Sequence, residues 1–191
     1  MRLPLIALLL VVLSACTADP EAAPDEAPPT SVAEAETDLP PCPEQGPAAS
    51  EVDAALGDLV FECFGGGDLD LASAPGTPTV LNLWASWCAP CREELPFVDQ
   101  LATAAGDRLR VIGVASQDGI PQASSFAADA GLGFPSAFDA DGALAAGLGL
   151  KGLPHSVFLA PDGSVAHVEV GAVDSYDELR ALVSEHLGVQ L

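Results

Sequence analysis

The sequence predicts an α/β domain in which helices flank a central mixed β-sheet. Residues 79–84 and 109–115 are short apolar runs typical of buried strands, and a segment with helical spacing of apolar residues separates them. Strand, helix and strand at this length form a βαβ unit, so these two strands should be parallel. Residues 156–159 and 165–170 flank Pro161-Asp162-Gly163, which has hairpin-turn chemistry and predicts antiparallel strands beside them.

The other elements follow from the same periodicities. Two short runs around three glycines predict a small N-terminal β-hairpin, and three further segments have apolar residues at helical spacing. The βαβ helix should begin near Pro90 and end near Ala105. The remaining expected ranges are 59–64 and 69–71 for the hairpin, then 121–130, 141–148 and 176–187 for the helices.

Composition limits the function classes. The chain has 191 residues, which suits one ordinary domain with tails. It has six Lys+Arg against 28 Asp+Glu, a net charge of −22. Nucleic-acid binding and a polybasic membrane patch both need clustered cations, so the charge balance excludes both classes.

The N-terminus predicts export. Arg2 precedes an apolar run over residues 3–13 that is too short to span a bilayer comfortably, and the run ends in Leu13-Ser14-Ala15-Cys16. This ending resembles a bacterial lipobox. The resemblance implies a signal peptide over 1–15 and a lipidated Cys16 at the extracytoplasmic face of the bacterial cell membrane. The alternative is an ordinary cleaved signal in which Cys16 stands by chance.

A tether is expected next. Residues 16–41 are rich in proline, alanine and acid and contain no aromatic residue, so they should form a disordered, extended spacer. The folded domain should then occupy 42–191.

Four cysteines remain besides Cys16. Cys88 and Cys91 form a C-x-x-C, and in an oxidising compartment the leftover Cys42 and Cys63 most simply pair with each other. The alternative is a zinc site with all four as ligands. It is disfavoured because structural zinc usually takes two close-spaced pairs. We therefore expect no metal.

The stretch 80–96, Val-Leu-Asn-Leu-Trp-Ala-Ser-Trp-Cys-Ala-Pro-Cys-Arg-Glu-Glu-Leu-Pro, resembles the active-site segment of the thioredoxin superfamily, within it the extracytoplasmic TlpA/ResA/DsbE-like group. Gly152-Leu153-Pro154 lies where the superfamily carries its cis-proline, and the segment before it has room for the group's helical insertion. The likeness covers about 59–187. It implies a thioredoxin-like fold with an N-terminal β-hairpin and a central helical insertion, and an enzyme that is a protein thiol–disulfide oxidoreductase.

The expected chemistry runs through Cys88. It should lie where the strand ends and the helix begins, and the helix N-terminus favours its thiolate, which is the nucleophile. Cys91 should lie deeper and resolve the mixed disulfide. The resemblance places the proton-handling acid at Glu94, because Asn82 occupies the strand position of the acid of cytosolic thioredoxins. Glu93 could serve instead, and Glu94 could be merely a solvated helix residue.

Substrate contacts are expected around the pair. Trp87 should be an exposed aromatic wall, and the resemblance implies that Leu153 contacts substrate through its backbone beside a cis Pro154. His155 is expected at the surface, with a proton carrier near the sulfurs as the alternative.

The function expected from the resemblance is reduction of protein disulfides, of the type that prepares apocytochrome c for haem attachment. A disulfide-forming oxidant is the main alternative, since a C-x-x-C alone does not set the potential. A peroxiredoxin-like peroxidase and a Sco-like copper-binding protein are weaker alternatives. We expect no cofactor, a monomer, protein thiol or disulfide substrates, and a membrane redox partner that resets the pair.

Overall fold

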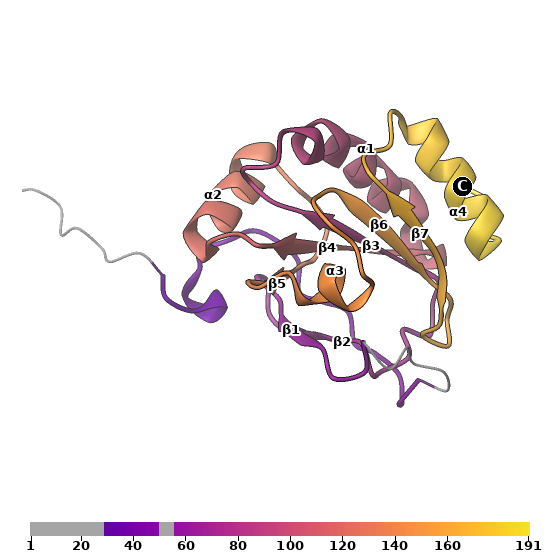
Figure 1. Ribbon diagram of the computed structural model, residues 1–191, viewed down its shortest axis with the longest axis horizontal. Coiled ribbons are helices and arrows are strands. Elements are labelled where there is room, and N and C mark those ends of the chain that lie inside the picture. The colour runs from indigo at the N-terminus through magenta and orange to yellow at the C-terminus, as the bar shows by residue number, and fades with distance from the viewer. Residues whose placement is uncertain (1–28, 50–55) are drawn as a thin grey trace, which may run out of the picture.

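A computed structural model describes residues 29–49 and 56–191 and has the predicted α/β architecture (Figure 1). A five-stranded mixed sheet has the strand order β5-β4-β3-β6-β7, and a separate two-stranded sheet pairs β1 with β2. The strands are β1 Val60–Glu62, β2 Asp68–Asp70, β3 Thr79–Trp84, β4 Arg110–Ser116, β5 Ser136–Asp139, β6 His155–Leu159 and β7 Val165–Val170. The helices are α1 Ala89–Ala105, α2 Ile120–Ala130, α3 Ala143–Gly147 and α4 Tyr176–Leu187, with short 3-10 turns η1 Val32–Glu34 and η2 Gly106–Arg108.

Strand β3 is the centre of the sheet, and all six of its residues are buried. It runs parallel to β4, from Thr79 opposite Arg110 to Trp84 opposite Ala115, and antiparallel to β6. A strand covered on both faces reads as a continuous apolar run, which is why the sequence shows no alternation here. The carboxyl end of β3 therefore opens at the middle of one sheet edge.

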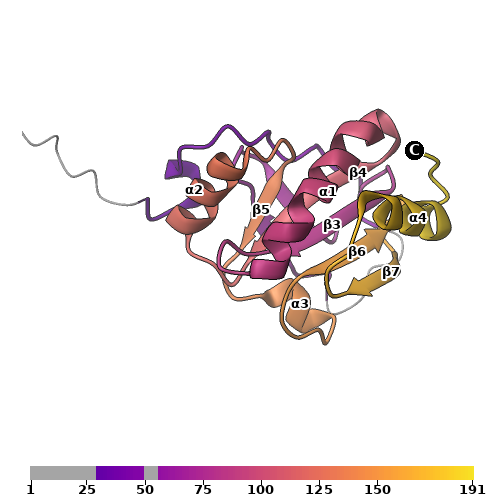
Figure 2. The same ribbon diagram turned by 90° about the horizontal axis from the view of Figure 1, so that it is seen from above.

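The two faces of the sheet have different covers. Helices α1, α2 and α4 pack on one face, where Trp84 and Phe158 meet apolar side chains such as Val98 and Val183. The β1–β2 hairpin and α3 pack on the other face (Figures 1 and 2). These two covers confirm the expected N-terminal hairpin and helical insertion.

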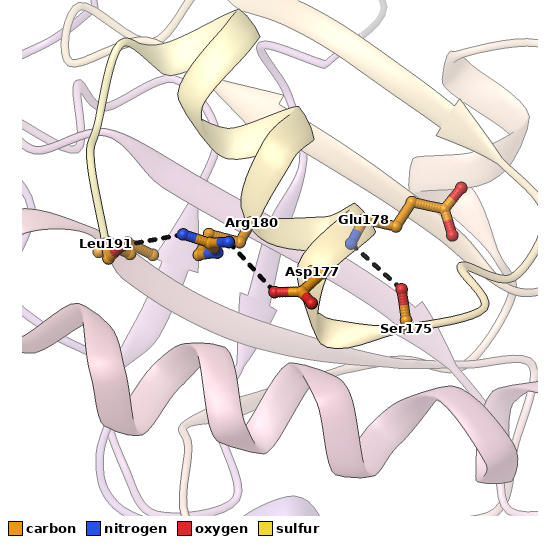
Figure 3. A network of polar contacts seen from close by, with 5 residues as sticks. All are labelled: Ser175, Asp177, Glu178, Arg180 and Leu191. Atoms are coloured by element: carbon orange, nitrogen blue, oxygen red, sulfur yellow. Dashed lines mark hydrogen bonds and ion pairs between the residues drawn. The ribbon is translucent and has the colours of Figure 1, made fainter.

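Helix α4 has well-defined ends and matches the predicted range 176–187 (Figure 3). The Ser175 hydroxyl accepts a hydrogen bond from the Glu178 N–H at 3.2 Å, which is an N-cap. Asp177 pairs with Arg180 at 3.1 Å, and Arg180 also donates to the Leu191 carbonyl at 3.5 Å. The C-terminal residue is thereby held against the helix.

Strand β5 was not predicted. It has only four residues, Ser-Ala-Phe-Asp, too few to show a period. It exists because its neighbours supply partners, since it pairs with β4 and its Ser136 carbonyl accepts from the Phe64 N–H at 3.0 Å. Its last residue, Asp139, caps α3 by accepting from the Ala143 N–H at 2.8 Å.

The structure joins Cys42 to Cys63, with a Cα–Cα distance of 6.0 Å. Cys63 follows β1 and bridges Ala137 of β5, and the Cys42 N–H donates to the Gly66 carbonyl at 2.9 Å. The disulfide therefore ties the N-terminal segment to the hairpin and, through it, to the sheet edge.

The predicted disordered tether over 16–41 is wrong at its C-terminal end. Residues 29–41 contain η1, and Val32 and Leu39 are buried in the same apolar cluster as Phe64. Gly65 permits this contact, because a Cβ at that position would collide with the Leu39 carbonyl oxygen. Two apolar side chains in a polar segment thus suffice to seat it on the domain.

The predicted signal peptide 1–15, Cys16 and residues 17–28 lie outside the described residues. Among the residues that the structure describes, no helix combines the length and the apolar character needed to cross a bilayer.

Candidate active site

The chain leaves β3 through a tight turn that places Cys88 at the start of α1. The Cys88 N–H donates to the Ala85 carbonyl at 3.1 Å, so Ser86 and Trp87 are the central residues of the turn. Cys88 is the N-cap residue, with extended backbone, and its sulfur accepts from the Cys91 N–H at 3.2 Å. Pro90 suits the first helical turn because its missing N–H would have no partner there.

Cys88 and Cys91 form a disulfide, with a Cα–Cα distance of 5.3 Å. The structure therefore represents the oxidised form. Cys88 is 4% exposed and Cys91 is 1% exposed, so the second cysteine lies slightly deeper. The free N–H groups at the start of the 17-residue helix α1 favour a thiolate at Cys88 in the reduced form.

Glu94 lies three residues beyond Cys91, on the same face of α1, and is only 1% exposed. The Asn82 side-chain amide donates to its carboxylate at 3.0 Å and also lies 3.2 Å from the Ser156 hydroxyl. Burial raises the pKa of Glu94 from 4.5 to about 7, although the hydrogen bond from Asn82 opposes the rise. The alternative interpretation of Glu94 as a solvated helix residue is thus wrong. Its neighbour Glu93 is exposed.

The Leu153–Pro154 peptide bond is cis. The Pro154 carbonyl accepts from the Gly171 N–H at 3.1 Å, and the next residue, His155, opens β6 opposite Leu83 of β3. This register puts the Leu153–Pro154 segment at the sheet edge from which the Cys88 turn emerges. Pro154 is buried and Leu153 is half-buried.

The expected surface position of His155 is wrong, because its side chain is 2% exposed. The residue begins an interior strand between β3 and β7, and its Nδ1 accepts from the Gly171 N–H at 3.4 Å. Alternate residues of a strand point to opposite faces. Since Ser156 lies beside Asn82 on the α1 face, His155 points to the hairpin face, away from Glu94.

Two site residues were not found from the sequence. The Asp118 carboxylate accepts from the Ser86 N–H at 2.6 Å and from the Ser86 hydroxyl at 3.1 Å. The Gln117 carbonyl accepts from the indole N–H of Trp87 at 2.9 Å, while the ring itself stays 59% exposed. A signal for them existed: β3 and β4 are parallel, so the loops at their carboxyl ends must meet.

The zinc alternative fails on the cysteines themselves, because Cys42 and Cys63 are bonded to each other. Within residues 29–49 and 56–191, no three His, Cys, Asp or Glu side chains are grouped as metal ligands would be. His167 and His186 stack face to face, with ring centroids 3.7 Å apart, on β7 and α4.

Comparison with known proteins agrees with this geometry. The Redoxin family model matches residues 40–183. The chain is 29% identical to the thioredoxin-like protein YneN of Bacillus subtilis over 61% of this chain and 69% of that protein. It is 33% identical to the thiol:disulfide interchange protein DsbE of Escherichia coli over 50% of this chain, but the match spans only 51% of DsbE.

A solved structure extends the comparison. A secreted Mycobacterium tuberculosis disulfide oxidoreductase, described as homologous to E. coli DsbE, is 30% identical with a TM-score of 0.61. The match covers 70% of this chain and 99% of that one. The fold, the C-x-x-C at the start of α1 and these similarities together show that the chain belongs to the Redoxin family, among its TlpA/ResA/DsbE-like thiol–disulfide oxidoreductases.

Proposed function

We propose that this chain reduces disulfide bonds of exported proteins, apocytochrome c among them, at the extracytoplasmic face of the cell membrane. The observation that carries the proposal is the buried Glu94, held by Asn82 one helical turn beyond Cys91. A carboxyl whose pKa is about 7 can give and take a proton near neutral pH, which is what exchange at a buried second cysteine requires.

The proposed reaction is a two-electron exchange. The Cys88 thiolate attacks one sulfur of the substrate disulfide, and the other substrate sulfur leaves as a thiolate. Cys91 then attacks the Cys88 sulfur and releases the second substrate thiolate. The Cys91 proton and one proton from water end on the two substrate thiolates, and the enzyme is left with the Cys88–Cys91 disulfide.

Glu94 acts at the second step. Cys91 is a poor nucleophile as a thiol, and it is buried away from water. With its ionised carboxylate, Glu94 accepts the Cys91 proton while Cys91 attacks, and then releases it to the departing substrate thiolate. When the protein is re-reduced by a dithiol of a membrane partner, Glu94 takes up a proton from the partner's thiol and gives it to the Cys91 sulfur as that sulfur leaves.

The charge around the pair favours the reducing direction. An oxidant of this type needs its reduced, thiolate form stabilised. Here a carboxyl is buried beside Cys91, and the nearest arginine in sequence, Arg92, lies over the Phe126 ring at 5.2 Å. Negative charge near a thiolate disfavours it, so the disulfide is relatively stable and the dithiol gives up its electrons readily.

Trp87, Leu153 and Pro154 supply the substrate contacts in this proposal. Trp87 is the exposed apolar side chain next to Cys88. The cis segment at Leu153 and Pro154 lies at the same sheet edge, so an extended substrate segment placed along it brings its disulfide to Cys88.

The decisive measurement is the reduction potential of the Cys88–Cys91 pair, taken from equilibrium with dithiothreitol or glutathione. A value near thioredoxin's, about −270 mV, is expected for a reductant. A value near about −120 mV would show a disulfide-forming oxidant instead. A Cys42→Ala/Cys63→Ala control, which lacks the second disulfide, should give the same potential and so assign it to Cys88–Cys91.

A trapping experiment tests the roles of the two cysteines. Cys91→Ser should accumulate mixed disulfides between Cys88 and natural partners, because the resolving thiol is gone. Cys88→Ser should accumulate none. Trapping by Cys88→Ser alone would reverse the assignment of nucleophile and resolver.

The membrane location rests on the lipobox-like segment at Cys16 and on the acidic, proline-rich stretch after it. Mass spectrometry of the mature N-terminus should find Cys16 with attached acyl chains, and Cys16→Ser should release the protein from the membrane fraction. A mature chain that begins elsewhere and lacks acyl mass would overturn this part of the proposal.

A further inference from the structure

The turn that presents Cys88 is held from outside by the loop between β4 and α2. Each central residue of the turn bonds to one residue of that loop. Ser86 donates its N–H and its hydroxyl to the Asp118 carboxylate at 2.6 and 3.1 Å, and Trp87 donates its indole N–H to the Gln117 carbonyl at 2.9 Å. The loop thus forms hydrogen bonds with two successive residues of the turn, Ser86 and Trp87.

The loop is itself held in an unfavourable conformation. Gln117 has φ +56°, in the left-handed region that side chains other than glycine avoid. Its N–H donates to the Asp139 carbonyl at 3.0 Å, and the facing Gly142 leaves room for its side chain, since a Cβ there would lie 2.5 Å from the Gln117 Nε2. Such strain persists only where surrounding contacts impose it, and it accompanies functional sites.

Asp118 brings a negative charge to this turn and forms no ion pair with any residue that the structure describes. Its carboxylate accepts from Ser86 and from the Gly119 N–H at 2.8 Å, all neutral donors. The side chain is half-buried. Ser86 and Cys88 are two residues apart, so the carboxylate that Ser86 binds lies on the order of 10 Å from the Cys88 sulfur.

We infer that Asp118 is a positioning residue of the exchange reaction, which orients the Cys88 turn and whose charge restrains ionisation of Cys88. The helix N-terminus stabilises the thiolate, and Asp118 opposes it from the other side of the turn. The reduced form is thereby less stabilised, so the pair is biased toward the disulfide and toward donating electrons. This inference rests on the proposed function of Cys88 and Cys91.

The test measures how readily Cys88 ionises. In a Cys91→Ser background with the Cys42–Cys63 bond intact, iodoacetamide labels the Cys88 thiolate, and mass spectrometry gives the labelling rate against pH. Adding Asp118→Asn should lower the midpoint by about half to one pH unit, which is about 3- to 10-fold more thiolate below the midpoint. Asp118→Ser removes the same charge and serves if the Asn variant fails to fold.

Two further variants separate charge from structure. Asp129→Asn removes an exposed carboxylate at the end of α2, whose side chain has no hydrogen bond among the described residues, and should leave the midpoint in place. Asp118→Glu keeps the charge and should keep the midpoint within about 0.3 pH unit. A midpoint that is unmoved in Asp118→Asn, or moved equally in Asp129→Asn, would overturn the inference.

A second readout uses the intact pair. Above the Cys88 midpoint, Asp118→Asn should shift the equilibrium with dithiothreitol about 3- to 10-fold toward the dithiol form. An unchanged equilibrium there would also overturn the inference. Failure of the proposed function is a different result: the unsubstituted chain would exchange no protein disulfides, while the labelling midpoints would still follow the charge at Asp118.

Discussion

Replacing Glu94 with Gln should remove a large part of the pH dependence of stability. The pKa of an ordinary glutamate, 4.5, applies to Glu94 in the unfolded chain, and burial raises the pKa of Glu94 to about 7 in the folded protein. Between these values the folded protein keeps a proton that the unfolded chain releases, so the free energy of unfolding falls as pH rises. The stabilisation is complete below pH 4.5 and is lost as pH passes through about 7.

The magnitude follows from the gap between the two values. From 4.5 to about 7, at about 1.36 kcal/mol per pH unit, the loss is about 3 kcal/mol. Glu94 is 1% exposed, so solvent screening reduces this figure little. Gln keeps an oxygen that can accept from Asn82 but never ionises. Between pH 4 and pH 8, the free energy of unfolding of the variant should therefore rise by about 3 kcal/mol relative to that of the parent chain.

Urea unfolding of the oxidised protein, followed by tryptophan fluorescence at five pH values, measures this difference. The matched control is Glu93→Gln, which neutralises the exposed neighbour on the same helix turn. Its stability difference from the parent should stay constant within a few tenths of a kcal/mol. Parallel stability curves for the parent and Glu94→Gln would refute the assignment of a buried, proton-binding carboxyl at Glu94.

Three other perturbations have defined outcomes. Asn82→Ala removes the hydrogen bond that lowers the pKa of Glu94, so the inflection near pH 7 in the exchange rate should move to higher pH. An inflection at lower pH would contradict the proposed role of Asn82. Cys42→Ala/Cys63→Ala opens a bridge with a sequence separation of 21 and should lower the free energy of unfolding by about 3 kcal/mol in urea titrations, while exchange by the folded protein persists; a loss of exchange would give this disulfide a catalytic role. Gly142→Ala adds a Cβ at φ +71° against the Gln117 side chain, so thermal unfolding should show a loss of at least about 1 kcal/mol, and an unchanged midpoint would argue that the loop is free to move.

The sequence predicted the elements that are long enough for their apolar residues to show a clear pattern. The apolar run of β3 is observed at its predicted bounds, as is the terminal helix α4, where a serine cap and an αL glycine mark the two ends. Strand β5 was missed because its pairing partners, β4 and the segment at Phe64, are distant in sequence and decide its existence.

The site was predicted unevenly for a similar reason. The C-x-x-C at a strand–helix junction identified Cys88 and Cys91, and the resemblance of the surrounding segment to the TlpA/ResA/DsbE-like group added Glu94. The burial that separates Glu94 from Glu93 depends on the α1 face packing over Asn82, which is a tertiary contact. His155 was misplaced because a strand that starts directly after a proline gives no sign of being covered on both sides.

Asp118 illustrates what single-sequence reasoning lacks. An Asp-Gly pair after a buried strand is ordinary turn chemistry, and nothing local distinguishes it. The contact of Asp118 depends on the parallel pairing of β3 and β4, because this pairing places the loops at their carboxyl ends side by side. The Asp118 carboxylate can then accept a hydrogen bond from the Ser86 N–H of the neighbouring turn.

The packing of residues 29–41 on the domain also shortens the distance that the domain could reach from a lipid anchor at Cys16. With Cys16 in the bilayer, as proposed, the chain between residue 16 and residue 29 limits how far the domain can lie from the membrane. At about 3.5 Å per residue, its full extension is about 45 Å, instead of about 90 Å for the whole predicted tether. The segment 29–41 contacts the domain beside Phe64 and Gly65, near the β1–β2 hairpin. Under the proposed anchoring, this length would keep the disulfide pair within a limited distance of the membrane, which would favour partners that are membrane-bound or emerging from it.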